Sequence, residues 1–144
     1  MRAILFPTTV LFALALTACG SQTKIEECNA LVSVINKGVD KVQKGTTATP
    51  DGGAAVDELR ALADELDNVA KETAEVKLTL PDLQKYGEDY KAMATEVAAS
   101  ARELADAVDN VDMEKMTAAQ ARMDAAVKRE DPLVGEINEF CQTP

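Results

Sequence analysis

The sequence predicts an all-α protein, an up-down-up-down four-helix bundle with a short C-terminal helix. Apolar residues recur at spacings of three and four through most of the chain, as in amphipathic helices. No segment alternates like a β-strand, and turn-forming residues divide the chain into pieces of helical length. The alternative is an elongated helical hairpin that completes its core by self-association.

The first helix is expected over residues 24–44. Thr23 and Glu26 have the spacing of a capping box, with Thr23 as the N-cap and Glu26 reaching back to it. The apolar positions of this segment alternate by three and four, which is a heptad seam. They are Ile25, Cys28, Val32, Ile35, Val39 and Val42.

The second helix is expected over residues 54–77, after a loop rich in turn residues at 45–53. Its inward face carries Leu59, Leu62, Leu66, Val69, Thr73 and Val76. Pro81 fits the first position of a third helix, which should end near Asn110. The seam of that helix is Leu83, Tyr86, Tyr90, Met93, Val97, Leu104 and Val108.

The fourth helix is expected over residues 112–130, with Met113, Met116, Met123 and Val127 facing inward. Asp131-Pro132 should interrupt it, because proline disfavours the helical conformation in the residue before it. A short closing helix then covers residues 132–141. Short links between amphipathic helices favour an antiparallel bundle, and alanines near the seams allow close approach.

Composition excludes several functions. All 25 Asp and Glu residues lie after residue 18. Removal of residues 1–18, the leader described below, would take away Arg2 and leave a net charge of about −11. Such a surface repels nucleic acid. The chain has no His, which excludes Ser-His-Asp catalysis and His-ligated haem or zinc. We therefore expect no nucleic-acid partner, no metal, no cofactor and no catalytic residue.

The N-terminus has the pattern of a signal peptide. An apolar run at residues 10–16 follows Arg2 and is too short to span a bilayer. It ends in Leu16-Thr17-Ala18-Cys19, which closely resembles the lipobox of bacterial lipoproteins. That resemblance implies cleavage before Cys19, a diacylglycerol on its sulfur and usually an acyl chain such as palmitate on the new amino end. The alternative is an ordinary secretory signal cut elsewhere, which leaves Cys19 unmodified.

This interpretation divides the chain into three parts: a removed signal peptide at 1–18, a lipidated Cys and short tether at 19–23, and a helical domain at 24–144. In the best-known members of the family, Asp after the lipidated Cys retains the protein in the inner membrane. Gly20 stands there in this chain, so we expect the outer membrane, facing the periplasm. The lipid anchor makes that membrane a partner.

The remaining cysteines, Cys28 and Cys141, are predicted to form a disulfide. Exported proteins mature in an oxidising compartment. An up-down-up-down bundle brings the end of the chain back beside its start. A shared L-V-x-x-I-N pattern at residues 31–36 and 133–138 favours the antiparallel register in which the two cysteines meet. Two buried free thiols are the alternative.

Two other groups of residues admit a binding role. Acidic residues crowd the second helix and the end of the third, where they form either a solvated face or a weak cation site without EF-hand spacing. These residues are Asp57, Glu58, Asp64, Glu65, Asp67, Asp106, Asp109, Asp112 and Glu114. The methionines of the last two long helices form either plain core or an adaptable groove, and Tyr86 with Tyr90 either packs in the seam or stacks a ligand.

The leading functional hypothesis is a lipid-anchored, non-enzymatic helical protein of the bacterial envelope, which binds or braces other envelope components and has an envelope protein as its partner. The second is a carrier of a small ligand or cation, through the acidic face or a Met-lined groove. The third is an enzyme that uses carboxylates alone, as glycosidases do. Nothing in the sequence favours the third.

Overall fold

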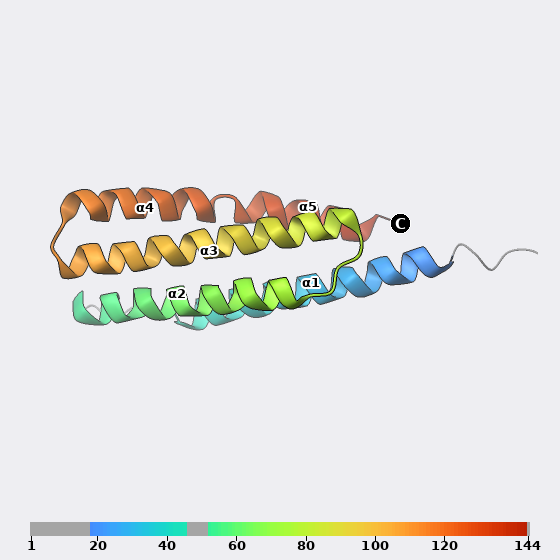
Figure 1. The fold of residues 1–144 in the computed structure, drawn as a ribbon, viewed down its shortest axis with the longest axis horizontal. Helices are drawn as coiled ribbons and strands as arrows, with labels where there is room; N and C mark the ends of the chain where they lie inside the picture. The colour runs from blue at the N-terminus through green and yellow to red at the C-terminus, as the bar shows by residue number, and fades with distance from the viewer. Residues whose placement is uncertain (1–17, 46–51, 144) are drawn as a thin grey trace, which may run out of the picture.

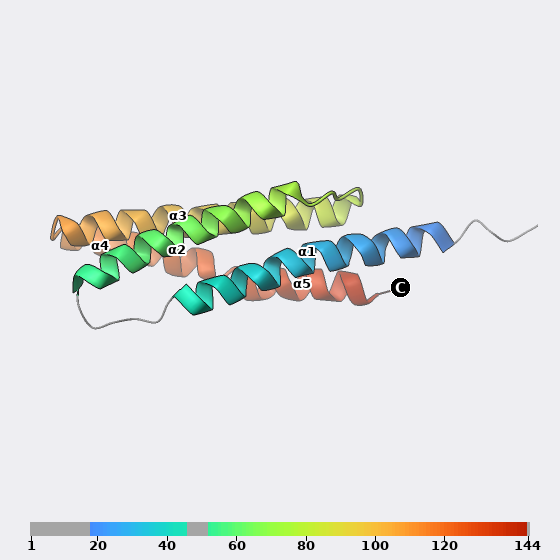
Figure 2. The ribbon, with the colours of Figure 1, turned by 90° about the horizontal axis from the view of Figure 1, so that it is seen from below.

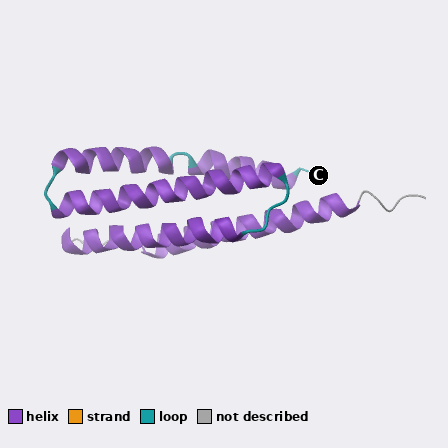
Figure 3. Cartoon of the chain, viewed as in Figure 1, coloured by secondary structure: helices purple, strands orange, loops and turns teal. Residues whose placement is uncertain are grey.

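The computed structural model describes residues 18–45 and 52–143, with side chains at 22–41 and 56–143. The predicted signal peptide therefore lies almost wholly outside the described residues, as does most of the expected loop at 45–53. Over the described residues the chain forms five helices and no strand (Figure 3). They are α1 (Ala18–Gly45), α2 (Gly52–Glu75), α3 (Pro81–Asp109), α4 (Met113–Val127) and α5 (Glu130–Gln142).

The predicted bundle is confirmed. α1, α2 and α3 run antiparallel to one another in succession, and α4 and α5 follow one another along the length of α3 (Figure 1). Together α4 and α5 supply the fourth helix of the bundle. The chain ends beside α1, whose first turns extend beyond the rest of the bundle (Figure 2).

α3 is the central helix, packed most extensively against α2 and α4 and more lightly against α5 and α1. It can contact several neighbours because it has two buried stripes, one of large side chains and one of alanines. The large stripe includes Leu83, Tyr90, Met93, Val97 and Leu104; the alanine stripe is Ala94, Ala98, Ala101 and Ala105. Alanine at the second stripe lets a neighbouring helix approach closely.

α1 begins earlier than expected, and its predicted inward face is confirmed at Cys28 and Ile35 but not at Ile25. It starts at Ala18, so the residues predicted as a tether are helical and Thr23 is not an N-cap. Glu26 accepts a hydrogen bond from Gln22 Nε2 at 3.1 Å, an i,i+4 pair along the helix. No proline stands in residues 19–23 to stop the helix. Ile25, which was predicted to face inward, is 58% exposed, whereas Leu31, which was not among the predicted inward positions, is fully buried.

The buried face of α4 also differs from the prediction. Met113 and Val127 are exposed, whereas Ala119 and Ala126 are buried and Met116 and Met123 are partly buried. The prediction was wrong for Met113 and Val127 because it ranked positions by side-chain size, whereas Met123 packs against the core as predicted. Two helices with alanine at their contact approach closely, which suits the extensive packing of α4 on α3. In the alanine stripe of α3, Ala98 and Ala101 cluster with Ala63 of α2, and Met123 of α4 packs against this cluster.

The interruption before the last helix falls at Lys128-Arg129 rather than at Asp131-Pro132. Pro132 lacks the N–H that would bond to the carbonyl of Lys128, and its ring crowds that carbonyl. The chain therefore leaves the helix one turn before the proline. Pro132 itself lies in the first turn of α5, where no intrahelical N–H is required.

A buried carboxylate holds the link between α2 and α3. Glu27 on α1 is 7% exposed and accepts hydrogen bonds from the backbone N–H groups of Thr79 and Leu80, at 2.9 and 3.1 Å. The Thr79 hydroxyl donates to the same carboxylate. These bonds fix the entry of the chain into α3, which begins at Pro81 as predicted.

Candidate functional site

An apolar cavity of about 470 Å³ lies in the middle of the bundle. Side chains of α1, α2, α3 and α4 line it, and the break between α4 and α5 contributes the last residues of its mouth. The lining consists of Gly38, Val39, Leu62, Leu66, Val69, Tyr90, Met93, Val97, Met123, Asp124, Val127, Lys128 and Glu130. Pockets that hold small molecules commonly measure about 300–1,000 Å³, so this cavity has an adequate size.

The cavity exists because one seam of the bundle does not close. α1 packs on α2, and α4 packs on α3, but α1 and α4 are not among the pairs of described helices that pack extensively. Gly38 brings α1 close to α2, since a Cβ at this position would lie 2.8 Å from a Val69 methyl carbon. α5 fills the space beside α1 at the other end of the bundle (Figure 2).

Tyr90 is the polar group among the buried side chains of the cavity wall. The residue is 3% exposed. Within the described part of the chain its hydroxyl makes no hydrogen bond, and the oxygen is not fully enclosed, because the fully buried unpartnered side-chain oxygen there is Glu65 Oε2. Buried tyrosines usually place the hydroxyl against a polar partner. Burial and, to a smaller extent, the nearby Glu130 carboxylate raise the Tyr90 pKa to about 12. The hydroxyl is therefore neutral at physiological pH and able to donate a hydrogen bond.

Three charged residues surround the mouth: Asp124, Lys128 and Glu130. Glu130 is partly buried, and this burial raises its carboxyl pKa, with a smaller contribution from neighbouring Asp131. With one cation and two acids, the mouth is weakly negative on a chain whose net charge is −10.

The Met-lined groove of the second hypothesis corresponds in part to this cavity. Met93 and Met123 line it, whereas Met113 is exposed at the start of α4 and Met116 is partly buried outside the lining. Tyr86 and Tyr90 do not act as a pair. The ring of Tyr86 packs edge-on against Phe140, with 6.0 Å between the centroids, and only Tyr90 reaches the cavity.

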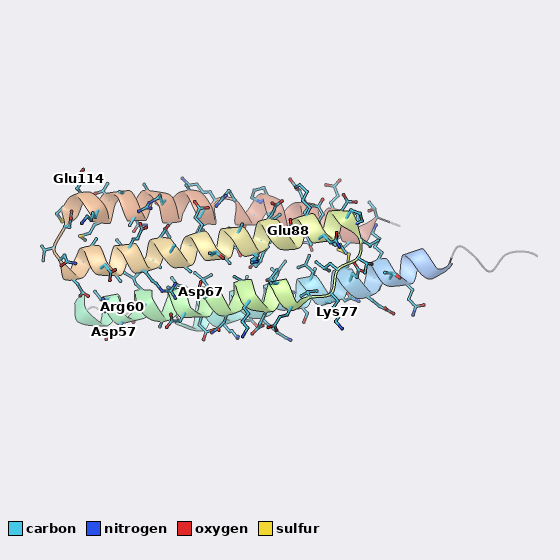
Figure 4. The ribbon with its side chains drawn as sticks, viewed as in Figure 1. Asp57, Arg60, Asp67, Lys77, Glu88 and Glu114 are labelled. Atoms are coloured by element: carbon cyan, nitrogen blue, oxygen red, sulfur yellow. A yellow bond between two sulfur atoms is a disulfide. The ribbon has the colours of Figure 1, made fainter. Side chains whose placement is uncertain are left out.

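The acidic clusters form ion pairs between helices. Arg60 on α2 lies 3.4 and 2.5 Å from carboxylate oxygens of Asp106 and Asp109 on α3. Arg102 on α3 lies 2.7 Å from oxygens of both Asp64 and Asp67 on α2. Figure 4 labels Asp57, Arg60 and Asp67 along α2.

Further acids have other partners. Lys41 bridges Glu65 and Glu72, at 3.7 and 3.1 Å. Asp112 is the N-cap of α4 and accepts from the backbone N–H of Lys115 at 3.1 Å. Among the described residues, no group of three or more His, Cys, Asp or Glu is placed to hold a metal ion.

The predicted disulfide is present. Cys28 on α1 and Cys141 on α5 are joined, with their Cα atoms 5.8 Å apart. Both residues belong to the largest apolar cluster, together with the L-V-x-x-I-N residues Val32, Ile35, Val134 and Ile137. Lys24 Nζ adds a hydrogen bond of 2.7 Å to the Thr143 carbonyl oxygen, so α1 and the end of the chain are tied at two points.

Cys19 lies in the first turn of α1, but its side chain is outside the described part of the structure, as are residues 1–17 of the proposed leader. Among the described helices, none is long and apolar enough to cross a membrane. Comparison with profiles of protein families, with curated proteins and with solved structures finds no match to this chain.

Sequence reasoning missed the residues that open and surround the cavity, namely Gly38, Lys128 and Glu130. A glycine inside a heptad pattern indicates close approach of two helices, which would have drawn attention to Gly38. Pro132 indicated a break nearby. Neither signal shows that the break faces the gap left beside α1.

Proposed function

We propose that this chain is a lipid-anchored, non-enzymatic protein of the bacterial envelope that binds or braces other envelope components. The observation that carries the proposal is the pairing of Cys28 with Cys141. Such a bond persists in an oxidising compartment, as expected of an exported protein. It uses the two cysteines outside the lipobox-like sequence, so Cys19 is left for the lipid.

The continuous α1 helix suits a bracing role. Cys28 follows Cys19 by nine residues of α1, which is a rise of about 14 Å. A helix from the anchor to the bundle would hold the bundle at a fixed height above the membrane, whereas an extended tether would not. Partners should then lie on the same membrane or close to it.

A second candidate function, carriage of a small ligand, is favoured by the cavity of about 470 Å³. A brace has no need of an open seam in its core. A carrier needs an apolar site with few polar groups, as this one has. The two functions are compatible in one chain.

The anchor is tested by metabolic labelling with an alkyne-bearing fatty acid, followed by fractionation. Cys19→Ser should lose the label and fail to mature, whereas Cys141→Ser, which removes a different cysteine, should keep it. A Cys19→Ser protein that still matured, carried label and sedimented with membranes would disprove lipidation at this residue.

Bracing is tested by changing the height of the bundle. A long flexible Gly-Ser insert after Gln22 should impair the ability of the gene to complement the defect of cells from which the gene has been deleted. A rigid insert of two helical turns in the same place is the matched control and should preserve function better. Equal, full complementation by both inserts would argue against a brace and leave the carrier.

A further inference from the structure

We infer that the cavity binds an uncharged, mainly apolar small molecule that carries one hydrogen-bonding oxygen. This inference rests on the second proposed function, the carrier, and is independent of the lipid anchor. Three properties of the cavity lead to it: its dimensions, the unpartnered Tyr90 hydroxyl and the charge at the mouth.

The dimensions favour a short chain or a small ring system. Along α2 the lining runs from Leu62 to Val69, which is a rise of about 10 Å. Eight of the thirteen lining residues have aliphatic or methionine side chains, and the two methionines adapt to irregular shapes. Burying an apolar ligand here contributes about 25 cal/mol for each Å² removed from water.

Tyr90 provides the specific polar contact. Apart from the three charged residues at the mouth, Tyr90 is the one lining residue with a polar side chain, and the described residues give its hydroxyl no hydrogen bond. A ligand oxygen in reach would accept the hydroxyl hydrogen. An alcohol, ester or ketone satisfies this requirement without bringing a charge into the cavity.

The mouth disfavours an anion. Asp124 and the partly buried Glu130 outnumber Lys128 there, and Glu130 is already desolvated. A ligand carboxylate would add a like charge at a site where burial penalises the charged form. A fatty acid should therefore bind more weakly than the alcohol of the same length.

Two other occupants fit less well. The acyl chains expected on Cys19 are about 28 Å of helix away from Gly38, at 1.5 Å per residue. A second copy would need a broad apolar patch. Among the described residues the exposed large apolar side chains are Ile25, Val111, Met113 and Val127, and of these only Val127 lies on the cavity.

The test uses the mature part of the chain, residues 19–144, with Cys19→Ser and without the leader, so that no acyl chain, apolar leader or bilayer takes up the probe. Helical circular dichroism and an intact disulfide confirm folding before each measurement. N-phenyl-1-naphthylamine, an uncharged fluorophore, reports occupancy of the cavity. Octan-1-ol and octanoate then compete with it at pH 7.5, where octanoate is ionised.

We expect saturable binding of the fluorophore and displacement by octan-1-ol at a concentration at least tenfold lower than by octanoate. Equal displacement by the two would overturn the ligand class while leaving the carrier in place. Absence of saturable binding would overturn both. A concentration-dependent dimer that excludes the fluorophore would show that the cavity is an interface between copies.

Three variants locate the site. Val127→Trp should occlude the mouth and weaken fluorophore binding at least tenfold, whereas Ala125→Trp, exposed on α4 and absent from the lining, should leave it unchanged. Tyr90→Phe keeps the ring and removes one hydrogen bond, so octan-1-ol should bind about 2- to 10-fold more weakly. Unchanged fluorophore binding in Val127→Trp, together with unchanged octan-1-ol binding in Tyr90→Phe, would place both probes elsewhere and refute the inference.

Discussion

Gly38 and Gly135 both lie inside helices, yet their surroundings are opposite. A Cβ at Gly38 would lie 2.8 and 2.9 Å from the two methyl carbons of Val69, whereas a Cβ at Gly135 would meet nothing within 4 Å. Val69 is 2% exposed and β-branched, so it has little freedom to turn away. Gly38 is therefore required by the α1–α2 contact, and Gly135 is not required by packing.

Alanine substitution should distinguish the two glycines. Gly135→Ala should stabilise the protein by about 1 kcal/mol, because alanine is the better helix former. Gly38→Ala has the same favourable change in helix propensity, but overpacking against Val69 costs about 1–3 kcal/mol of stability, so its net effect is destabilising. Urea unfolding of the two variants beside the parent measures both values. A Gly38→Ala variant stabilised as much as Gly135→Ala would show that α1 moves freely away from α2.

At the scale of helices, periodicity predicted which segments are helical but not which residues begin them or face inward. Pro81 marks the start of α3 by its own chemistry, so that boundary was predicted correctly. Thr23 and Glu26 fit a cap, but a cap only competes with continuation of the helix, and here the helix continues. Met113 and Ala119 show the same limit, since burial depends on how closely α4 approaches α3.

Contacts that are distant in sequence escaped prediction for a related reason. In the sequence, nothing distinguishes Glu27 from an ordinary exposed acidic residue such as its neighbour Glu26. Its role appears only when the α2–α3 link passes over it, because its partners Thr79 and Leu80 are some fifty residues away in the chain. Local patterns carry no signal for such a bond.

Glu27→Gln should destabilise the protein at pH 7 and lower the Tm by several degrees. The hydrogen bond from the Thr79 hydroxyl lowers the Glu27 pKa most. Burial acts in the opposite direction, and the hydrogen bonds from the backbone N–H groups of Leu80 and Thr79 lower the pKa further. Because the folded-state pKa is below the unfolded value, the carboxylate stabilises the fold above the unfolded pKa. This contribution is lost as the pH falls through the folded-state pKa.

The difference in stability between Glu27→Gln and the parent should therefore shrink as the pH is lowered from 7 towards 3. Thermal unfolding followed by circular dichroism across this range measures it. Glu26→Gln, an exposed change at the neighbouring position, is the control and should have little effect at any pH. A constant difference at all pH values would assign the loss to packing rather than to charge.

At the scale of the whole molecule, the described residues form a bundle that is closed at one end and open between α1 and α4 in its middle. The closed end joins α1 to α5 through the disulfide and a continuous apolar cluster. The heptad pattern and the repeated L-V-x-x-I-N sequence allowed this end to be predicted. The open seam could not be predicted, because it depends on the distance between α1 and α4, which share no sequence pattern.

The disulfide should contribute much of the stability of this arrangement. It joins residues separated by 113 positions, and in the loop-entropy model a closed loop of that size contributes up to about 4.7 kcal/mol. Replacing both Cys28 and Cys141 with Ser should therefore lower the Tm by about 10 °C or more. Protection from hydrogen exchange should fall first in α5, because the bond is its covalent tie to α1 and only apolar contacts and the Lys24 hydrogen bond would remain. Non-reducing mass spectrometry of the parent must find the bond intact, and two freely alkylated thiols, or a double variant as stable as the parent, would contradict this structural role.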